Sequence, residues 1–246
     1  MRRGPGSLYR RWKSLEYLAT RDRRAVLGWL GRGELGLGPR VRLLRDFVRT
    51  TNAVRGYHTL GEMLAISREI LARRAPVVLE AGCGYGSSTA KLSLAVRQAG
   101  GVLHACDSFR GMPENDEQHR HLDGRATQFR AGAFRGSLNR VRRTVAEYGA
   151  LEVCRFHKGL VADTLPRIEG ALDVVVLDVD LEASTRTCVR ELFPRLRPGG
   201  VMFSLDGQLR ATHELLGDPR FWRDDVGIDP PHIEGLGRDK LLIMRA

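Results

Sequence analysis

Carboxylates and glycines gather where one apolar run of the sequence ends. The run Val77–Ala81 carries Glu80, and Gly82, Gly84 and Gly86 follow it at alternate positions. Glycines at such a place let the backbone turn tightly and approach a ligand closely. The NAD fingerprint GxGxxG seats a pyrophosphate, but this loop reads GxGxG after an acid. A carboxylate repels a pyrophosphate and attracts a cation or an amino group.

A second acid ends the next apolar run. Asp107 follows Glu80 by 27 residues and closes the stretch 102–108. An acid at this place can take both hydroxyls of a ribose, as it does for NAD. S-adenosylmethionine has a ribose, a sulfonium and an amino-acid end, and no phosphate. The two acids and the glycines therefore favour a loop that binds S-adenosylmethionine over a loop that is only a tight turn.

Alternating apolar runs and helical patterns must position these residues. We expect strands at 77–81, 102–108, 151–159, 173–180, 201–206 and 240–246. Helices are expected at 60–74, 136–148 and 183–196, and the RPGG segment 197–200 is expected to turn. This alternation predicts an α/β fold with a doubly wound, mostly parallel seven-stranded sheet. The polar stretch 110–135 has no period and is expected to cover the active site as a loop, with His119 and His121 as minor candidates for a base.

The N-terminal part differs from the rest. We expect residues 1–55 to form a helical extension and residues 56–246 to form the catalytic domain. Four aromatic side chains in the extension lie outside the predicted strands: Tyr9, Trp12, Trp29 and Phe47. We expect them to form a surface that binds a partner subunit. The prediction is a symmetric homodimer.

Composition limits the remaining classes. The chain has 246 residues and a formal charge of +11, but only four of its 40 basic residues are lysines, and the arginines are spread along the chain. Nucleic acid is therefore not the expected partner. The four cysteines lack CxxC spacing, which is typical of reduced thiols. The chain has no apolar run of about 20 residues, so we expect no transmembrane segment. We expect a cytoplasmic location.

Longer segments resemble a known family. "LEAGCGYG" and "CDSF" are similar to the first two motifs of class I S-adenosylmethionine-dependent methyltransferases. "DSFRGMPE" (107–114), "KGLVADTLP" (158–166), "LDVDLEAST" (177–185) and "LFPRLRPGGVMFSLD" (192–206) resemble the macrocin O-methyltransferase family. The resemblance runs from about residue 55 to 210. It implies methylation of a hydroxyl on a natural product or its sugar.

The resemblance also implies roles for single residues. Cofactor contacts are expected from Glu80, Gly82, Gly84, Gly86, Ser88, Asp107, Ser108, Gly159 and Asp178. Asp178 is the first candidate for general base or metal ligand, and His58 is a second catalytic candidate.

A magnesium site is implied in incomplete form. The family places an acid after the fourth strand and an acidic pair after the fifth. Asp178 matches the first position and Asp206 one member of the pair, but Leu205 replaces the other. Asp180 is a third oxygen donor or a helix cap. The weakened site keeps two alternatives open: a non-catalytic relative that retains the cofactor fold, and, from the charge alone, a nucleic-acid methyltransferase.

Overall fold

Apolar runs form adjacent strands in the middle of a seven-stranded sheet. The computed structural model describes residues 22–31 and 33–246. Its strands are β1 (Val77–Ala81), β2 (Val102–Asp107), β3 (Cys154–Lys158), β4 (Leu172–Leu177), β5 (Leu196–Ser204), β6 (Ile233–Glu234) and β7 (Leu242–Arg245). The order is β3-β2-β1-β4-β5-β7-β6, and β7 runs antiparallel to β5 and β6. The predicted doubly wound, mostly parallel seven-stranded sheet is confirmed.

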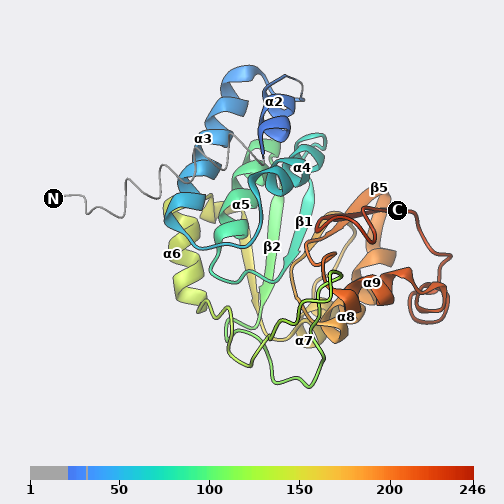
Figure 1. The fold of residues 1–246 in the computed structure, drawn as a ribbon. Helices are drawn as coiled ribbons and strands as arrows, with labels where there is room; N and C mark the ends of the chain where they lie inside the picture. Colours follow the sequence, from blue (N-terminus) through green and yellow to red (C-terminus); the bar gives the residue numbers. More distant parts are fainter. Residues whose placement is uncertain (1–21, 32) are drawn as a thin grey trace.

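Helices cover both faces of this sheet (Figure 1). They are α2 (Arg23–Gly31), α3 (Leu37–Ala53), α4 (Leu60–Leu71), α5 (Ser87–Ala99), α6 (Leu138–Tyr148), α7 (Val161–Thr164), α8 (Glu182–Leu192) and α9 (Arg210–Gly217). Short 3-10 segments lie at Leu151–Val153, Leu165–Arg167 and Phe193–Arg195, and a π-helix at Phe221–Val226. None of these described helices combines the length and the hydropathy that a bilayer span needs.

Alternate residues of each strand enter two different cores. On β1, Val78 packs with residues of α2 to α5, whereas Leu79 packs with residues of α8 and α9. This division is what a parallel strand buried on both faces requires. Leu205, at the end of β5, belongs to the core on the α4 side and is fully buried.

The N-terminal helices are part of the same core. Trp29 and Phe47 are 2% and 0% exposed and pack in the cluster that contains Val78. These two aromatic residues therefore cannot contribute to the exposed partner surface that we predicted from them. The structure buries them because α2 and α3 lie on α4 and α5, a contact between segments that are distant in sequence. Tyr9 and Trp12 lie outside the described residues.

The largest differences from the predicted strands lie at β5 and β6. The RPGG segment lies inside β5, not between a helix and a strand. Pairing jumps from Leu172–Leu196 to Val174–Val201, so the extra residues bulge out of a continuous strand. Strand β6 has only two residues, and its pairing with β7 left no periodic signal in the sequence.

Candidate active site

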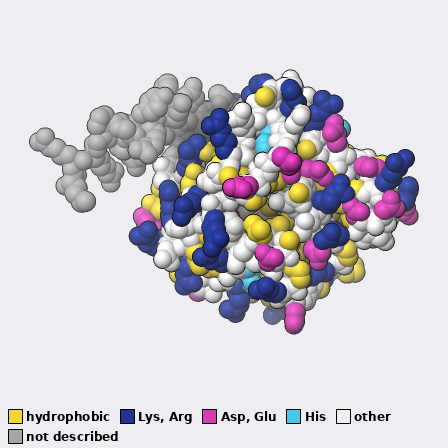
Figure 2. Space-filling view, turned by 90° about the horizontal axis from the view of Figure 1, so that it is seen from below, with side chains coloured by type: hydrophobic (Ala, Val, Ile, Leu, Met, Phe, Trp, Pro, Cys, Tyr) yellow, Lys and Arg dark blue, Asp and Glu magenta, His cyan; other side chains and the backbone are white. Residues whose placement is uncertain are grey.

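A cavity of about 660 Å³ opens at the carboxyl ends of β1, β2, β4 and β5. This is where the strand order reverses, because β2 lies on one side of β1 and β4 on the other. Figure 2 looks onto this end, where hydrophobic side chains gather in the middle and charged ones surround them. Of the predicted site residues, the cavity is lined by His58, Gly82, Gly84, Ser88, Asp107, Ser108, Gly159, Asp178 and Asp206. Glu80 and Gly86 are not in its lining.

Two glycines of the loop after β1 serve different purposes. Gly82 has φ +93°, and a Cβ atom there would lie 1.9 Å from the carbonyl oxygen of Asp178. Gly82 is therefore required by the contact between two protein loops. Gly84 has φ +48° with open space where its Cβ would be, so its bare backbone faces the cavity.

Asp107 ties the end of β2 to this glycine loop. Its Oδ2 accepts hydrogen bonds from the backbone N–H groups of Cys83 (2.8 Å) and Gly84 (3.2 Å), and its Oδ1 accepts one from Phe109 (2.6 Å). Burial raises the pKa of Asp107, and these three bonds oppose that shift. The carboxylate is thus fixed in orientation at the cavity wall. Next to it, Ser108 donates a hydrogen bond to the carbonyl oxygen of Gly111.

Glu80 lies beneath the cavity instead of in its wall. It is fully buried, and neither carboxylate oxygen has a hydrogen-bond partner of acceptable geometry among the described residues. Burial raises its pKa to about 7, although the nearby hydroxyls of Ser88 and Thr89 favour the ionised form. Glu80 therefore does not face the cavity, in contrast to the predicted contact with the cofactor.

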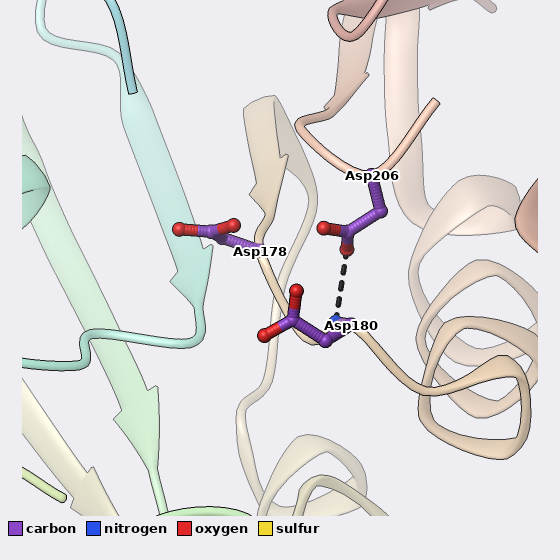
Figure 3. Close-up of side chains that lie close together, drawn as sticks. All are labelled: Asp178, Asp180 and Asp206. Atoms are coloured by element: carbon purple, nitrogen blue, oxygen red, sulfur yellow. Dashed lines mark hydrogen bonds between the residues drawn. The ribbon is translucent and has the colours of Figure 1, made fainter. Parts of the chain in front are cut away.

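Three aspartates converge at the ends of β4 and β5, next to the glycine loop. Asp178 and Asp180 follow β4, and Asp206 follows β5; one oxygen of each lies within 4.8 Å of the others (Figure 3). Asp206 Oδ2 accepts hydrogen bonds from the N–H groups of Val179 and Asp180, both 3.0 Å long. Asp180 has φ +59°, a left-handed backbone that aims its side chain into the cluster. The cluster is called the acidic triad below.

The acidic triad fits a divalent cation. Burial, and then the neighbouring carboxylates, raise the pKa values of Asp178 and Asp180, and burial raises that of Asp206. Asp206 Oδ1 is buried without a partner. The three carboxylates of the triad converge within 4.8 Å and would supply the oxygen ligands that magnesium prefers. Asp180 thus provides the third carboxylate of the candidate metal site. Leu205 provides none, because its side chain lies in the core.

The segment 110–135 covers the cavity as predicted. Its ends are held by backbone bonds from the Met112 N–H to Ala133 and from the Gly132 N–H to Met112. Its middle is held by a bond from the Leu122 N–H to the carbonyl oxygen of Gln208. Glu117 adds a side-chain bond to the far wall: its two oxygens accept from the N–H groups of Glu182 (2.8 Å) and Ala183 (3.1 Å). The loop is therefore fastened to the first turn of α8, two residues after Asp180.

His58 lies at the end of the cavity next to α5. Its Nε2 is 2.8 Å from Nζ of Lys91, a lysine that is only 1% exposed. Burial, and then the charge of Lys91, lower the pKa of His58 well below its ordinary value. The imidazole is therefore neutral at pH 7.

Four other histidines lie on the sheet or in the covering loop. His104 and His157 stack on each other on β2 and β3, with ring nitrogens 2.9 Å apart. His119 Nδ1 accepts from the N–H of Phe129, outside the cavity lining. His121 lines the cavity, and its backbone bridges to Leu209.

Three site residues were not found from the sequence: Lys91, Glu117 and Lys240. Lys91 carried a signal, because it is the only charged residue in the buried part of α5. Lys240 donates to the carbonyl oxygen of Tyr57 (2.7 Å) and lines the cavity. Its position, like that of Glu117, depends on contacts between distant segments and carries no local pattern.

Comparisons with known proteins agree with this geometry. Residues 45–230 match the family model described as macrocin-O-methyltransferase (TylF). The 8-demethyl-8-(2,3-dimethoxy-alpha-L-rhamnosyl)-tetracenomycin-C 4'-O-methyltransferase of Streptomyces olivaceus is 31% identical over 214 residues, 83% of this chain and 80% of the relative. Among solved structures, the O-methyltransferase NovP has a TM-score of 0.56 at 21% identity and covers 98% of both chains. The calicheamicin methyltransferase CalS11 has a TM-score of 0.60 at 17% identity, covering 100% of this chain and 94% of its own. These two structures support the fold.

Proposed function

This chain belongs to the macrocin O-methyltransferase family, and we propose that it transfers the methyl group of S-adenosylmethionine to a sugar hydroxyl of a glycosylated natural product. One observation carries this proposal: a single cavity joins the glycine loop and Asp107 to the acidic triad. The first pair supports the adenosine and methionine parts of the cofactor. The triad supports the acceptor hydroxyl, so donor and acceptor meet between them.

The wall of the cavity supports a large apolar acceptor. Tyr57, Phe129 and Phe134 form a chain of ring contacts with centroids 5.0 and 5.9 Å apart, and all three line the cavity. Leu160, 50% exposed, lies at the same cavity. The relative from Streptomyces olivaceus acts, by its name, on a rhamnosyl tetracenomycin. An aromatic aglycone against these rings would place its sugar toward the carboxylates.

Methyl transfer needs alignment of the hydroxyl with the methyl group and removal of one proton. We assign the proton to Asp178, which lies on the β1 side of the triad (Figure 3) with its backbone against Gly82. Burial and the neighbouring Asp206 raise its pKa to about 8, so its ionised form is a stronger base than that of an exposed aspartate. His58 is not assigned this role, because its Nε2 is occupied by Lys91.

Magnesium would be held by oxygens of Asp180, Asp206 and Asp178. A bound divalent ion would lower the pKa of an acceptor hydroxyl. Because Leu205 supplies no ligand, we expect weak magnesium binding and partial activity after chelation. Asp180→Asn should weaken magnesium stimulation at least tenfold, and Asp163→Asn, an exposed control on α7, should not. Equal stimulation by magnesium in both variants would show that Asp180 is not a magnesium ligand.

The acceptor class is tested by three compounds supplied with S-adenosylmethionine: a rhamnosylated aromatic polyketide, its aglycone, and methyl rhamnoside. We expect a methyl ether on the sugar of the first compound, with turnover at least tenfold above the other two. Methylation of the aglycone alone would overturn the sugar assignment. Methylation of RNA or DNA in preference to all three would support the nucleic-acid alternative instead.

Self-association and location complete the proposal. We keep the homodimer as a prediction, now based on Leu27, Leu37 and Val41, which are 47–59% exposed on α2 and α3. Light scattering of the full chain is the measurement, and a monomer at working concentration would refute it. A cytoplasmic location is the setting in which S-adenosylmethionine is supplied.

A further inference from the structure

A buried cation without a carboxylate partner lies behind the α5 end of the cavity. Lys91 is 1% exposed, and its Nζ contacts Nε2 of His58 (2.8 Å) and the hydroxyl of Ser87 (3.4 Å). Both partners are neutral, and no ion pair of Lys91 occurs in the described part of the chain. Burial lowers its pKa to about 7, and no acidic group opposes that shift. Natural proteins seldom bury a lysine in this way unless it has a function.

The proton arrangement makes His58 a donor toward the cavity. In its charged form Lys91 has no acceptor capacity, so its ammonium donates to Nε2 of His58. The one ring proton of a neutral imidazole then resides on Nδ1. Nδ1 has no partner among the described residues, and His58 lines the cavity together with Ser87.

Other groups make the same end of the cavity positive. The first turn of α5 begins at Ser87, so its unpaired N–H groups and the helix dipole add partial positive charge. Lys240, which also lowers the pKa of His58, lines the cavity nearby. Lys240 also opposes the raised pKa values of the three aspartates of the acidic triad, so it lies between the two charged groups. A ligand with an anionic group at one end and a reacting cationic centre in the middle matches this division of charge.

We propose that His58, Ser87 and the buried Lys91 bind the carboxylate of the methionine part of S-adenosylmethionine. Lys91 acts through His58 as a positioning residue, because it fixes the tautomer of the ring and supplies the countercharge from behind. Bound this way, the cofactor has its amino-acid end at α5 and its methyl group toward the triad. The inference rests on the proposed cofactor.

The test compares two ligands that differ only in the carboxylate. S-adenosylmethionine and decarboxylated S-adenosylmethionine are titrated by calorimetry into the wild-type chain and Lys91→Met. We expect Lys91→Met to lower the affinity for S-adenosylmethionine about 10–100-fold. The affinity for the decarboxylated ligand should fall less than twofold. Arg97→Met removes an exposed charge from the same helix and should change neither affinity.

Thermal unfolding separates this role from a structural one. A methionine in place of an unpaired buried cation should leave the Tm of the ligand-free protein unchanged or raise it. If Lys91→Met does not fold, His58→Leu is used, with the same ligand-selective loss expected. An equal loss for both ligands, or no loss for S-adenosylmethionine, overturns the inference. A wild-type chain that binds neither ligand overturns the proposed cofactor itself.

Discussion

Replacing Gly82 with alanine separates the needs of the fold from the needs of the ligand. The new Cβ would lie 1.9 Å from the carbonyl oxygen of Asp178, and contacts below 3.0 Å do not persist, so the two loops must part by roughly 1 Å. The Asp178 N–H donates to the carbonyl oxygen of Ala81 (2.9 Å), a bond that such a movement breaks. The left-handed backbone adds about 1–2 kcal/mol and the lost bond about 0.5–1.5 kcal/mol.

We therefore expect Gly82→Ala to lower the free energy of unfolding by about 1.5–3.5 kcal/mol. A displacement of about 1 Å at Asp178 should also lower turnover about 100-fold. Gly84→Ala is the matched control, because it has the same strain but no neighbour within 4 Å. It should cost about 1–2 kcal/mol and mainly weaken S-adenosylmethionine binding. Urea unfolding and calorimetry measure both effects; equal stability losses in the two variants would refute the reasoning.

Three further changes test other contacts of the site. Asp107→Ala should lower the affinity for S-adenosylmethionine at least tenfold, because it removes the carboxylate that accepts the ribose hydroxyls and three backbone N–H groups. An unchanged affinity by calorimetry would refute the assignment of Asp107 to the ribose. Burial raises the pKa of Glu80 from 4.5 to about 7, so the folded chain keeps a proton that the unfolded chain loses, and stability falls as the pH rises from about 4.5 to 7. At pH 8, Glu80→Gln should therefore have a free energy of unfolding about 1–3 kcal/mol above that of the wild type, measured by urea unfolding. This difference should disappear near pH 4.5. A difference that stays constant with pH would contradict the raised pKa of Glu80. Glu117→Ala should raise the acceptor KM several-fold and leave S-adenosylmethionine affinity within about twofold, whereas Glu114→Ala, an exposed neighbour in the loop, should change neither.

The sheet and the cofactor side of the site were predictable because their signals are local. Continuous apolar runs such as Val77–Ala81 mark parallel strands, and a glycine loop after such a run marks the ligand edge. The aspartates after 177 and 205 could be placed together for the same reason: the carboxyl ends of β4 and β5 are neighbours.

What remained hidden depends on tertiary contacts. The sequence pattern left Trp29 and Phe47 available to a partner, but α2 and α3 pack on the domain itself. The role of Gly82 in a loop contact, and that of Glu117 in fastening the covering loop, arise between segments that are far apart in sequence. Lys91 could have been noticed as a single charge in a buried helix, but its partner His58 could not.

The most direct test of the account is the transfer of labelled methyl from S-adenosylmethionine to a rhamnosylated aromatic polyketide, measured for the wild type and Asp178→Asn. The wild type should produce a labelled methyl ether on the sugar. Asp178→Asn should show a loss of about 10²–10⁴-fold, with cofactor affinity nearly constant. An Asp178→Asn variant that keeps wild-type turnover would contradict the claim that methyl donor and acceptor meet at the acidic triad.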